Sequence, residues 1–351
     1  MSEEGIILVG GGIAGVATAW FLARAGAREV VLVEKEPQLG MHSSGRNAAI
    51  LRTWTGDPVL DEIALESADF LRNPPGGFCE RPLIDRLGLI VVREQERETS
   101  PEWRSRLQRR DDFEVLSQAR MRRLAPHCDD GGRTAYYFPN DGRIDIALLL
   151  DSFARGARAL GARFELGAEV HRIVADDGQV QGVELVDGRV ITAERVLIAA
   201  GGWAGQLGKT AGSRARIRAT RRHLLVTPPD ARVEAGWPVV WSDALPFYVR
   251  PESGGLLMCP CDQSDVDPSR CETDASVLEM ARAKACRMIP AFADSPVARV
   301  WAGVRAFTDD RRFLIGADKE VSGLYFAAGL GGHGMTCSAA VGRLAAQSLL
   351  S

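Results

Sequence analysis

The sequence of 351 residues lacks the features that mark several classes of protein. No uninterrupted apolar stretch reaches the roughly 20 residues that a membrane-spanning helix needs. Basic residues do not exceed acidic ones, because 43 lysines and arginines stand against 46 aspartates and glutamates. A net charge of -3 gives no attraction toward nucleic acid or an anionic membrane. We expect a soluble monomer or small homo-oligomer that binds a small molecule, with no nucleic-acid partner and no membrane span.

Cysteine and histidine are too few and too scattered to indicate a metal site or a disulfide framework. The seven cysteines are an odd number, and Cys259 and Cys261 do not have the Cys-x-x-Cys spacing of zinc or dithiol sites. The five histidines are equally dispersed. We expect free thiols and no metal. Residues 1–4 (Met-Ser-Glu-Glu) lack the basic segment of an export signal, so the expected location is the cytoplasm.

What the first 34 residues do contain is the pattern of a strand, a glycine turn, a helix and a second strand. Continuous apolar runs over residues 5–9 and 30–34 predict two buried parallel strands. Between them, Ile13–Ala25 is predicted to be a helix that is ended by Gly26. This order predicts one β–α–β unit.

The glycines of this turn have the spacing of a dinucleotide-binding site. Gly10 suits a tight turn, Gly12 lets the backbone approach a pyrophosphate, and Gly15 lets the helix pack closely on the strand. The N-terminus of the helix offers N–H groups to phosphates. Glu34 ends the second strand, where it could accept a hydrogen bond from a ribose hydroxyl. An ordinary glycine turn is the alternative.

Three further stretches have residues that let a backbone approach a ligand. Residues 41–49 are small, polar and punctuated by glycine; an ordinary surface loop is the alternative there. Residues 195–203 form an apolar strand pattern that ends in two glycines. Residues 329–336 are glycine-rich and directly precede a predicted final helix over Ser338–Leu350.

The remaining pattern predicts two kinds of domain. Residues 73–77 (Asn-Pro-Pro-Gly-Gly) interrupt the chain. The expected elements beyond them are exposed helices over residues 101–125, a helix over Ile146–Leu160, a β-meander near residues 169–174, 180–186 and 190–199, and an antiparallel sheet over residues 222–258. We expect an α/β fold with a Rossmann-like cofactor-binding domain assembled from distant segments (residues 1–75, 146–206 and 301–351) and an antiparallel-sheet α+β substrate domain (residues 76–145 and 207–300).

Four motifs in this order resemble the D-amino acid oxidase-like FAD enzymes, which include glycine oxidase, sarcosine oxidase and the bacterial D-amino acid dehydrogenases. The motifs are Gly-Gly-Gly-Ile-Ala-Gly, Ser-Ser-Gly-Arg-Asn-Ala-Ala, Leu-Ile-Ala-Ala-Gly-Gly-Trp and Gly-Leu-Gly-Gly-His-Gly-Met. Residues 73–83, Phe247-Tyr248 and residues 301–305 are most similar to segments of the FAD-dependent D-arginine dehydrogenase branch.

The resemblance implies FAD and assigns contacts to it by position. It places the adenosine ribose at Glu34 and Lys35, the adenine near Val170, the pyrophosphate and flavin at Ala14 and residues 43–50, and the pyrimidine edge of the flavin at residues 331–336. The implied cofactor-binding residues are Gly10, Gly12, Ala14, Gly15, Glu34, Lys35, Ser43, Ser44, Gly45, Arg46, Asn47, Ala48, Ala49, Ile50, Val170, Gly201, Trp203, Gly331, Gly332, His333, Gly334, Met335 and Thr336. No cysteine lies in residues 305–308, where monomeric sarcosine oxidases attach their flavin, so we expect non-covalent FAD.

The resemblance also implies a carboxylate-binding group. Arg305 and Arg222 would bind the substrate carboxylate and Tyr248 would donate a hydrogen bond to it, with Gly303 in the same segment as Arg305. A structural salt bridge is the alternative for Arg305, and Arg221 could be the inward-facing residue in place of Arg222.

Departures from the D-arginine branch bear on the substrate. Leu89 stands where that branch has a glutamate for the guanidinium, and Ile50 and Thr55 stand where it has a histidine and a tyrosine. An apolar pocket wall at Leu89 would disfavour D-arginine. Arg52 could instead favour an acidic substrate, although a solvent-facing arginine is the common outcome.

We therefore predict a D-amino acid dehydrogenase or oxidase that uses FAD. A hydride would pass from Cα to flavin N5, and the imino acid would hydrolyse to a 2-oxo acid and ammonia. His333 is interpreted as a loop residue beside the flavin and not as a base. The electron acceptor would be oxygen or a quinone. The alternatives are a secondary-amine or 2-hydroxy-acid oxidoreductase, and a non-catalytic, electron-passing flavin subunit of a larger complex.

Overall fold

The first apolar run forms the centre of a parallel sheet in the computed structural model, which describes residues 5–93 and 101–351. Strand β1 (Ile6–Val9) pairs in parallel with β2 (Val30–Glu34) and with β13 (Arg195–Ile198). The strand order is β20-β21-β13-β1-β2-β9, and β20 is antiparallel to β21. The remaining strands of this sheet are the edge strands β9 (Arg163–Leu166) and β20 (Leu314–Ala317), and β21 (Leu324–Ala328), which lies between β20 and β13. All four residues of β1 are buried, which is why the run is apolar throughout.

Two stretches on which the sequence-based predictions touched lie outside the described ranges. They are residues 1–4, whose acidic sequence argued against an export signal, and residues 94–100 of the expected substrate segment.

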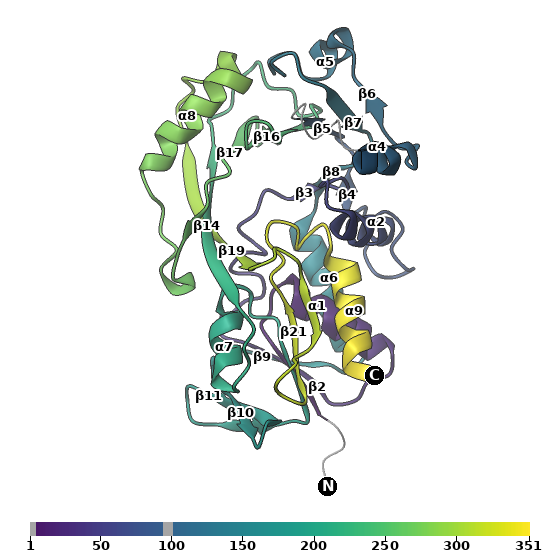
Figure 1. The fold of residues 1–351 in the computed structure, drawn as a ribbon, viewed down its shortest axis with the longest axis vertical. Coiled ribbons are helices and arrows are strands. Elements are labelled where there is room, and N and C mark those ends of the chain that lie inside the picture. The colour runs from purple at the N-terminus through teal and green to yellow at the C-terminus, as the bar shows by residue number, and fades with distance from the viewer. Residues whose placement is uncertain (1–4, 94–100) are drawn as a thin grey trace.

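Helices α1 (Ile13–Arg24), α6 (Ile146–Ala159) and α9 (Ser338–Leu350) lie side by side against the parallel sheet (Figure 1). Their inward side chains share one apolar core with β1. α1 and α9 are in close contact, since a Cβ on Gly342 would lie 2.7 Å from the Cβ of Ala17. A further helix, α2 (Pro58–Arg72), packs beside α9.

The ends of α1 and of the β-meander refine two predictions. α1 ends at Arg24, and Gly26 follows with a φ of +82° that suits glycine. The meander consists of β10 (Val170–Asp176), β11 (Gln179–Leu185) and β12 (Val190–Thr192). The prediction of one strand over residues 190–199 was wrong, because β12 ends before β13 begins and β13 pairs with β1 in the parallel sheet. A 3-10 turn, η1 (Gly201–Trp203), and helix α7 (Ala204–Thr210) follow β13.

A nine-stranded sheet forms the other half of the molecule. Its longest pair is antiparallel, β14 (Ile217–Val226) with β19 (Arg299–Thr308). The other strands are β5 (Leu89–Val92), β6 (Glu114–Val115), β7 (Ala135–Phe138), β15 (Val239–Ser242), β16 (Phe247–Glu252), β17 (Gly255–Cys259) and β18 (Ser264–Asp265). The sheet is mixed and not purely antiparallel as predicted, because β5 and β15 are parallel.

Short elements complete the described fold. The strands β3 (Ile50–Leu51), β4 (Ile84–Asp85) and β8 (Gly142–Ile144) form a small antiparallel sheet. The remaining helices are α4 (Pro101–Gln108), α5 (Gln118–Leu124), α8 (Ser276–Met288), η2 (Pro268–Arg270) and η3 (Pro290–Phe292).

The boundary that the sequence suggested at residue 301 does not fall between elements. Residues 301–308 belong to β19 and pair with β14 in the large sheet, whereas β20 and β21 belong to the parallel sheet. The glycines from residue 301 onward suggested turns of the cofactor-binding domain. In the structure, however, β19 pairs with β14 over its whole length. We keep the two-domain division as a proposal, with this boundary moved to the end of β19.

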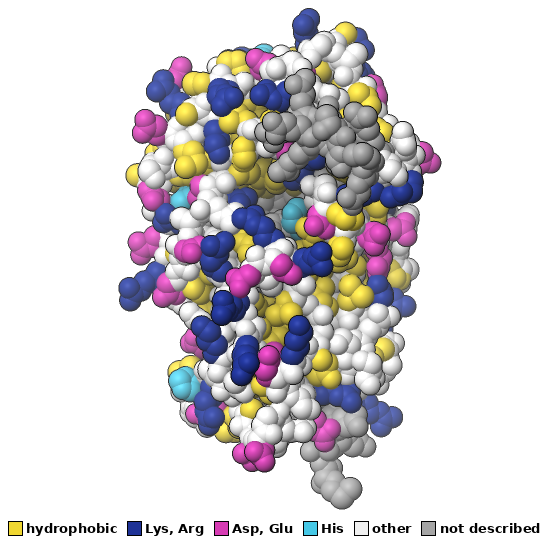
Figure 2. Space-filling model, viewed as in Figure 1, with side chains coloured by type: hydrophobic (Ala, Val, Ile, Leu, Met, Phe, Trp, Pro, Cys, Tyr) yellow, Lys and Arg dark blue, Asp and Glu magenta, His cyan; other side chains and the backbone are white. Residues whose placement is uncertain are grey.

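The surface carries charges of both signs, interspersed over the face in Figure 2. Within the described ranges, no helix combines the length and apolar character that crossing a bilayer requires. The seven cysteines are free thiols. The described residues also contain no group of three potential metal ligands.

Candidate active site

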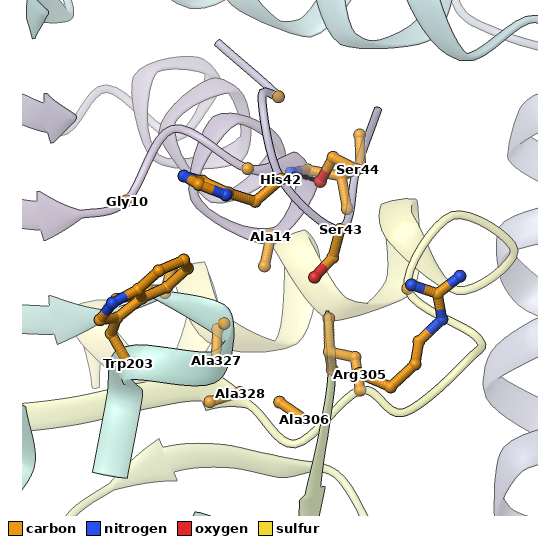
Figure 3. A pocket seen from close by; sticks show the side chains of 18 of the residues that line it. Gly10, Ala14, His42, Ser43, Ser44, Trp203, Arg305, Ala306, Ala327 and Ala328 are labelled. Atoms are coloured by element: carbon orange, nitrogen blue, oxygen red, sulfur yellow. Dashed lines mark hydrogen bonds between the residues drawn. The ribbon is translucent and has the colours of Figure 1, made fainter. Parts of the chain in front are cut away.

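One cavity of about 440 Å³ runs from the β1–α1 turn to the large sheet. In Figure 3, Trp203 lies at one end, Arg305 at the other, and Ala14 and Ser43 between them. The predicted residues that line the cavity are Gly10, Gly12, Ala14, Glu34, Lys35, Ser43, Ser44, Asn47, Ala48, Ala49, Ile50, Val170, Gly201, Trp203, Arg222, Tyr248, Arg305, Gly331, Gly332, His333, Gly334, Met335 and Thr336. The fold therefore gathers residues from both ends and the middle of the chain.

The glycine turn leaves open space where a phosphate group would lie. Gly10 has a φ of +114°, and a Cβ there would lie 2.6 Å from the carbonyl oxygen of Ala199. A Cβ on Gly15 would lie 2.0 Å from the carbonyl oxygen of Gly10, so Gly15 serves helix packing and does not line the cavity. At Gly12 the nearest atom would be Ser44 Oγ at 3.2 Å, and the space before it belongs to the cavity.

The first turn of α1 and the end of β2 present polar groups to this space. The N–H of Ile13 donates to Ser44 Oγ over 2.9 Å, which caps the helix from another segment. The buried carboxylate of Glu34 accepts hydrogen bonds from the backbone N–H groups of Gly11 and Glu36. These bonds fix the orientation of Glu34 at the cavity wall. Its contact with a ribose stays a prediction.

Residues 41–49 form a closed turn and not an ordinary surface loop. The side-chain amide of Asn47 donates to the carbonyl oxygens of Ser43 (3.2 Å) and Ser44 (2.7 Å). Ser43 Oγ donates to the carbonyl of Val304 over 2.7 Å, which joins the turn to β19. Two predicted residues face away: Gly45 closes the turn and Arg46 is exposed, and neither lines the cavity.

The end of the cavity at Trp203 contains a cluster of aromatic and cationic side chains, of which the sequence identified Lys35 and Trp203. The Lys35 ammonium lies 3.8 Å from the centroid of the Trp203 ring. The ring of His42 lies 4.7 Å from the same indole and bonds Glu36 at 2.8 Å. His42 was not predicted as a site residue, although it lies within the stretch 41–49 that carried the signal.

These features fit FAD. An open cradle at Gly12, a helix N-terminus, a fixed acidic side chain at the end of β2 and a second glycine loop before α9 lie along one cavity. In that second loop Gly331 has a φ of +54°, and its N–H donates to the carbonyl of Ala306 in β19 over 2.8 Å. Gly10, Gly12 and the α1 N-terminus would hold the phosphates, Glu34 the ribose, and residues 331–336 the flavin.

Arg305 is the central polar side chain at the other end of the cavity. It is 5% exposed, and its guanidinium donates to the carbonyls of Val304 (2.9 Å) and Arg46 (3.4 Å). No carboxylate among the described residues pairs with it, so the structural salt bridge considered as an alternative is not present there. Burial lowers the pKa of the Arg305 guanidinium. An uncompensated guanidinium in this setting is suited to bind an anion.

The strand register places Arg222, and not Arg221, beside Arg305. Arg222 lies opposite Gly303 and Arg305 opposite Thr220, so both arginines project from the same face of β14–β19. Arg221 faces the other way and pairs with Asp274 at 2.8 Å. Gly303 does not line the cavity. A Cβ there would lie 2.7 Å from the carbonyl oxygen of Arg46, so glycine permits the close approach of the 41–49 turn.

Tyr248 and His333 are both neutral groups of this end. The ring of Tyr248 stacks on Trp241 with centroids 4.4 Å apart, and burial raises the pKa of Tyr248 well above its ordinary value. Burial, followed by the charges of Arg52 and Arg222, lowers the pKa of His333 to about 4. A neutral tyrosine hydroxyl can donate a hydrogen bond, and His333 carries no charge at neutral pH.

Two of the three expectations about substrate-selecting residues need correction. Leu89 does not line the cavity: it is fully buried in the core of the large sheet, behind Ile50 and Trp241. Thr55 bonds the carboxylate of Asp61 and also lies outside the cavity lining. Ile50 does line it. The loss of a counter-charge at Leu89 therefore gives no information about the pocket.

Arg52 lines the cavity but is neither solvent-facing nor free. Its Nη2 pairs with Asp243 at 3.1 Å and its Nε donates to the carbonyl of Trp54 at 2.9 Å. The guanidinium lies 4.2 Å from the centroid of the Trp241 ring. Sequence reasoning could not find Asp243 and Trp241, because nothing in their local pattern differs from an ordinary strand end.

Known proteins resemble the chain over nearly its whole length. The family model described as "DAO: FAD dependent oxidoreductase" matches residues 6–348. The bovine "FAD-dependent oxidoreductase domain-containing protein 1" is 25% identical, with 98% of this chain and 81% of that protein aligned. The glycine oxidase of Bacillus licheniformis is 26% identical, with 98% of this chain and 92% of that protein aligned.

A solved structure has the same fold. The L-proline dehydrogenase of P. horikoshii superimposes with a TM-score of 0.86 at 24% identity, and the alignment covers 99% of this chain and 93% of that one. The narrower likeness to the D-arginine dehydrogenase branch stays a prediction. The chain belongs to the DAO family of FAD-dependent oxidoreductases.

Proposed function

We propose that the protein oxidises the Cα–N bond of an amino acid, of the D configuration, whose carboxylate is bound by Arg305, Arg222 and Tyr248. The observation that supports this most is the buried Arg305 guanidinium, which lines the cavity and has only backbone carbonyl partners among the described residues. A guanidinium offers parallel donors that match the two oxygens of a carboxylate.

The two neighbours of Arg305 complete the binding of the carboxylate. Arg222 projects from the same face of the strand pair and adds a second positive charge. Burial raises the pKa of Tyr248, so its hydroxyl stays protonated. That hydroxyl would donate a hydrogen bond to a carboxylate oxygen of the substrate. Three donors from three strands, β14, β16 and β19, would fix the orientation of Cα and leave the substrate little freedom to turn.

The reaction needs little acid–base chemistry from the chain. FAD, when bound, would supply the acceptor for the hydride that leaves Cα. The lone pair of a neutral amine expels that hydride, and the resulting imino acid hydrolyses to a 2-oxo acid and ammonia. His333, with its pKa lowered to about 4, is neutral and needs no role as a base. Oxygen or a quinone would then accept the electrons.

Charge at the substrate end, rather than Leu89, argues against D-arginine. Arg52, Arg222 and Arg305 line this part of the cavity, and a substrate guanidinium would meet three like charges. We also propose that FAD is held without a covalent bond, since no cysteine lines the cavity within the described residues.

An anaerobic screen of the purified yellow protein tests this function. D- and L-amino acids, N-methylated amino acids, 2-hydroxy acids and simple amines are each mixed with the holoenzyme, and flavin bleaching is followed. D-amino acids should bleach the flavin fastest, and amines without a carboxylate should be slow. Bleaching by 2-hydroxy acids alone, or only when a partner protein is added, would refute the proposal.

A further inference from the structure

We propose that the substrate carries a second carboxylate, so that it is a dicarboxylic amino compound of the aspartate, glutamate or iminodiacetate type. This inference rests on the proposed function, since one carboxylate is taken to bind Arg305 and Arg222. The second carboxylate would bind Arg52, on the wall formed with Trp241.

The charge on the cavity wall is the first step. Three arginines, Arg52, Arg222 and Arg305, line the end where substrate would bind. Within the described residues, the acidic side chains of the lining are Glu34 and Glu169, and both belong to the dinucleotide end near β2 and β10. Arg52, Arg222 and Arg305 each help to lower the pKa of His333, after burial, whereas Asp57 raises it.

The nearby carboxylates neutralise this charge only in part. Asp243 is shared between two guanidiniums, those of Arg52 and Arg93. Asp262 bonds the ring of His223 at 2.7 Å with its carboxylate, and Arg222 Nε donates to its backbone carbonyl over 2.8 Å. A single substrate carboxylate would still leave a net positive charge in a buried site, which is unfavourable.

Arg52 has the geometry of a pre-positioned binding group. Its Nε and Nη2 are held by the Trp54 carbonyl and Asp243, and its plane lies against Trp241. Trp241 donates its indole N–H to Asp243 at 3.1 Å and stacks on Tyr248. Nη1 of Arg52 has no hydrogen-bond partner in the described part of the chain, which leaves one N–H edge for a ligand.

The arrangement therefore contains two anion-binding positions in the lining of one cavity, which also includes the stacked rings of Trp241 and Tyr248. Arg305 and Arg222 form one, and Arg52 forms the other. A substrate with two carboxylates would satisfy both positions at once. A monocarboxylic substrate would satisfy one and leave Arg52 with Asp243 as its sole carboxylate partner among the described residues.

Ligand binding to the wild-type holoenzyme gives the first test, and it does not depend on turnover. Flavin absorbance is titrated with acetate, malonate and succinate at constant ionic strength. At least one dicarboxylate should bind 10-fold more tightly than acetate or better. Flavin reduction by aspartate, glutamate and iminodiacetate should likewise exceed that by alanine and glycine at least 10-fold in kcat/KM.

Substitution of Arg52 gives the second test. Arg52→Gln should lower kcat/KM for the preferred dicarboxylate 30- to 100-fold, the effect of losing one charge-assisted pair, while alanine changes less than 3-fold. Arg52→Lys should recover part of the loss. Arg106→Gln is the matched control, because Arg106 also pairs with a buried aspartate (Asp61) and lies over a tryptophan (Trp54, 4.9 Å) but does not line the cavity.

The outcomes separate this inference from the proposed function. Equal binding of acetate and the dicarboxylates, or equal losses for alanine and aspartate in Arg52→Gln, would overturn the second carboxylate and leave amino-acid oxidation standing. Reduction of the flavin only by compounds that lack any carboxylate would overturn the proposed function. If Arg52→Gln fails to fold, the wild-type titrations decide the question alone.

Discussion

Replacement of Arg305 by alanine is the most direct perturbation of the proposed reaction. The guanidinium is buried, lines the cavity and has no carboxylate partner among the described residues. Its loss would remove the proposed charge-assisted pair with the substrate, and it breaks no ion pair among the described residues. Arg305→Ala should therefore fold and keep FAD, while its affinity for carboxylate substrates falls.

The size of the effect follows from the environment. Hydrogen bonds to charged groups contribute about 1.5–3 kcal/mol, and a buried bidentate pair lies at the upper end of that range. About 3 kcal/mol corresponds to a factor of ~100 in the apparent dissociation constant. Arg222 and Tyr248 remain in Arg305→Ala, so binding should weaken and not vanish. Arg305→Lys keeps the charge but not the paired donors and should lose roughly 10-fold.

Stopped-flow flavin reduction across a substrate series separates binding from chemistry. The dissociation constant of the amino acid should rise ~100-fold in Arg305→Ala, and that of an amine of similar shape without a carboxylate should change less than 3-fold. Arg221→Ala is the control, because Arg221 lies in β14, the strand paired with that of Arg305, but faces away from the cavity and pairs with Asp274. Equal losses for the amino acid and the amine would refute carboxylate binding by Arg305.

Further outcomes are expected at the cofactor end and in the core. Gly12→Val should fold but lose FAD, whereas Gly15→Ala should destabilise the fold, because its Cβ would lie 2.0 Å from the Gly10 carbonyl; flavin content and thermal denaturation distinguish the two. Leu89→Glu should lower the melting temperature sharply and leave substrate selectivity unchanged, because the side chain is in the core. The pKa of His333 is lowered to about 4, so in the folded protein the ring stays neutral, whereas in the unfolded chain it takes up a proton below pH ~6.5. The free energy of unfolding should therefore fall by roughly 2 kcal/mol between pH 6.5 and 4, and by less in His333→Gln. Acid precipitation of the wild-type protein should release all its FAD into solution.

The sequence predicts the β–α–β unit well because the requirements there are local. A strand buried on both faces must be apolar throughout, as β1 is, and the turn at Gly10 needs a positive φ that glycine adopts without strain. The close approach at Gly15 likewise needs the absence of a Cβ. Each requirement acts on one or two residues, so each leaves a visible mark in the sequence.

Whether a side chain is buried, and whether it points into the cavity, is harder to predict, because both depend on segments that are distant in sequence and pack against the strand. The sequence suggested that Leu89 and Arg52 both face the substrate. Arg52 does line the cavity, but Leu89 lies in the core, packed against the lining residues Ile50 and Trp241. Arg52 is held inward by Asp243, which lies 191 residues later. No local pattern distinguishes an inward arginine with a distant partner from a solvated one.

The predicted boundary at residue 301 falls within β19, the strand that contacts both ends of the candidate site. β19 pairs with β14 in the large sheet, while its backbone accepts hydrogen bonds from the loops of the cofactor end: Ser43 Oγ bonds Val304 and the Gly331 N–H bonds Ala306. Arg305 lies between those two contacts. The distance from Arg305 to the two loops proposed to hold the flavin is therefore set within three consecutive residues of one strand. Because both loops bond β19 on either side of Arg305, we expect Arg305 to keep its position relative to them even where the two sheets shift.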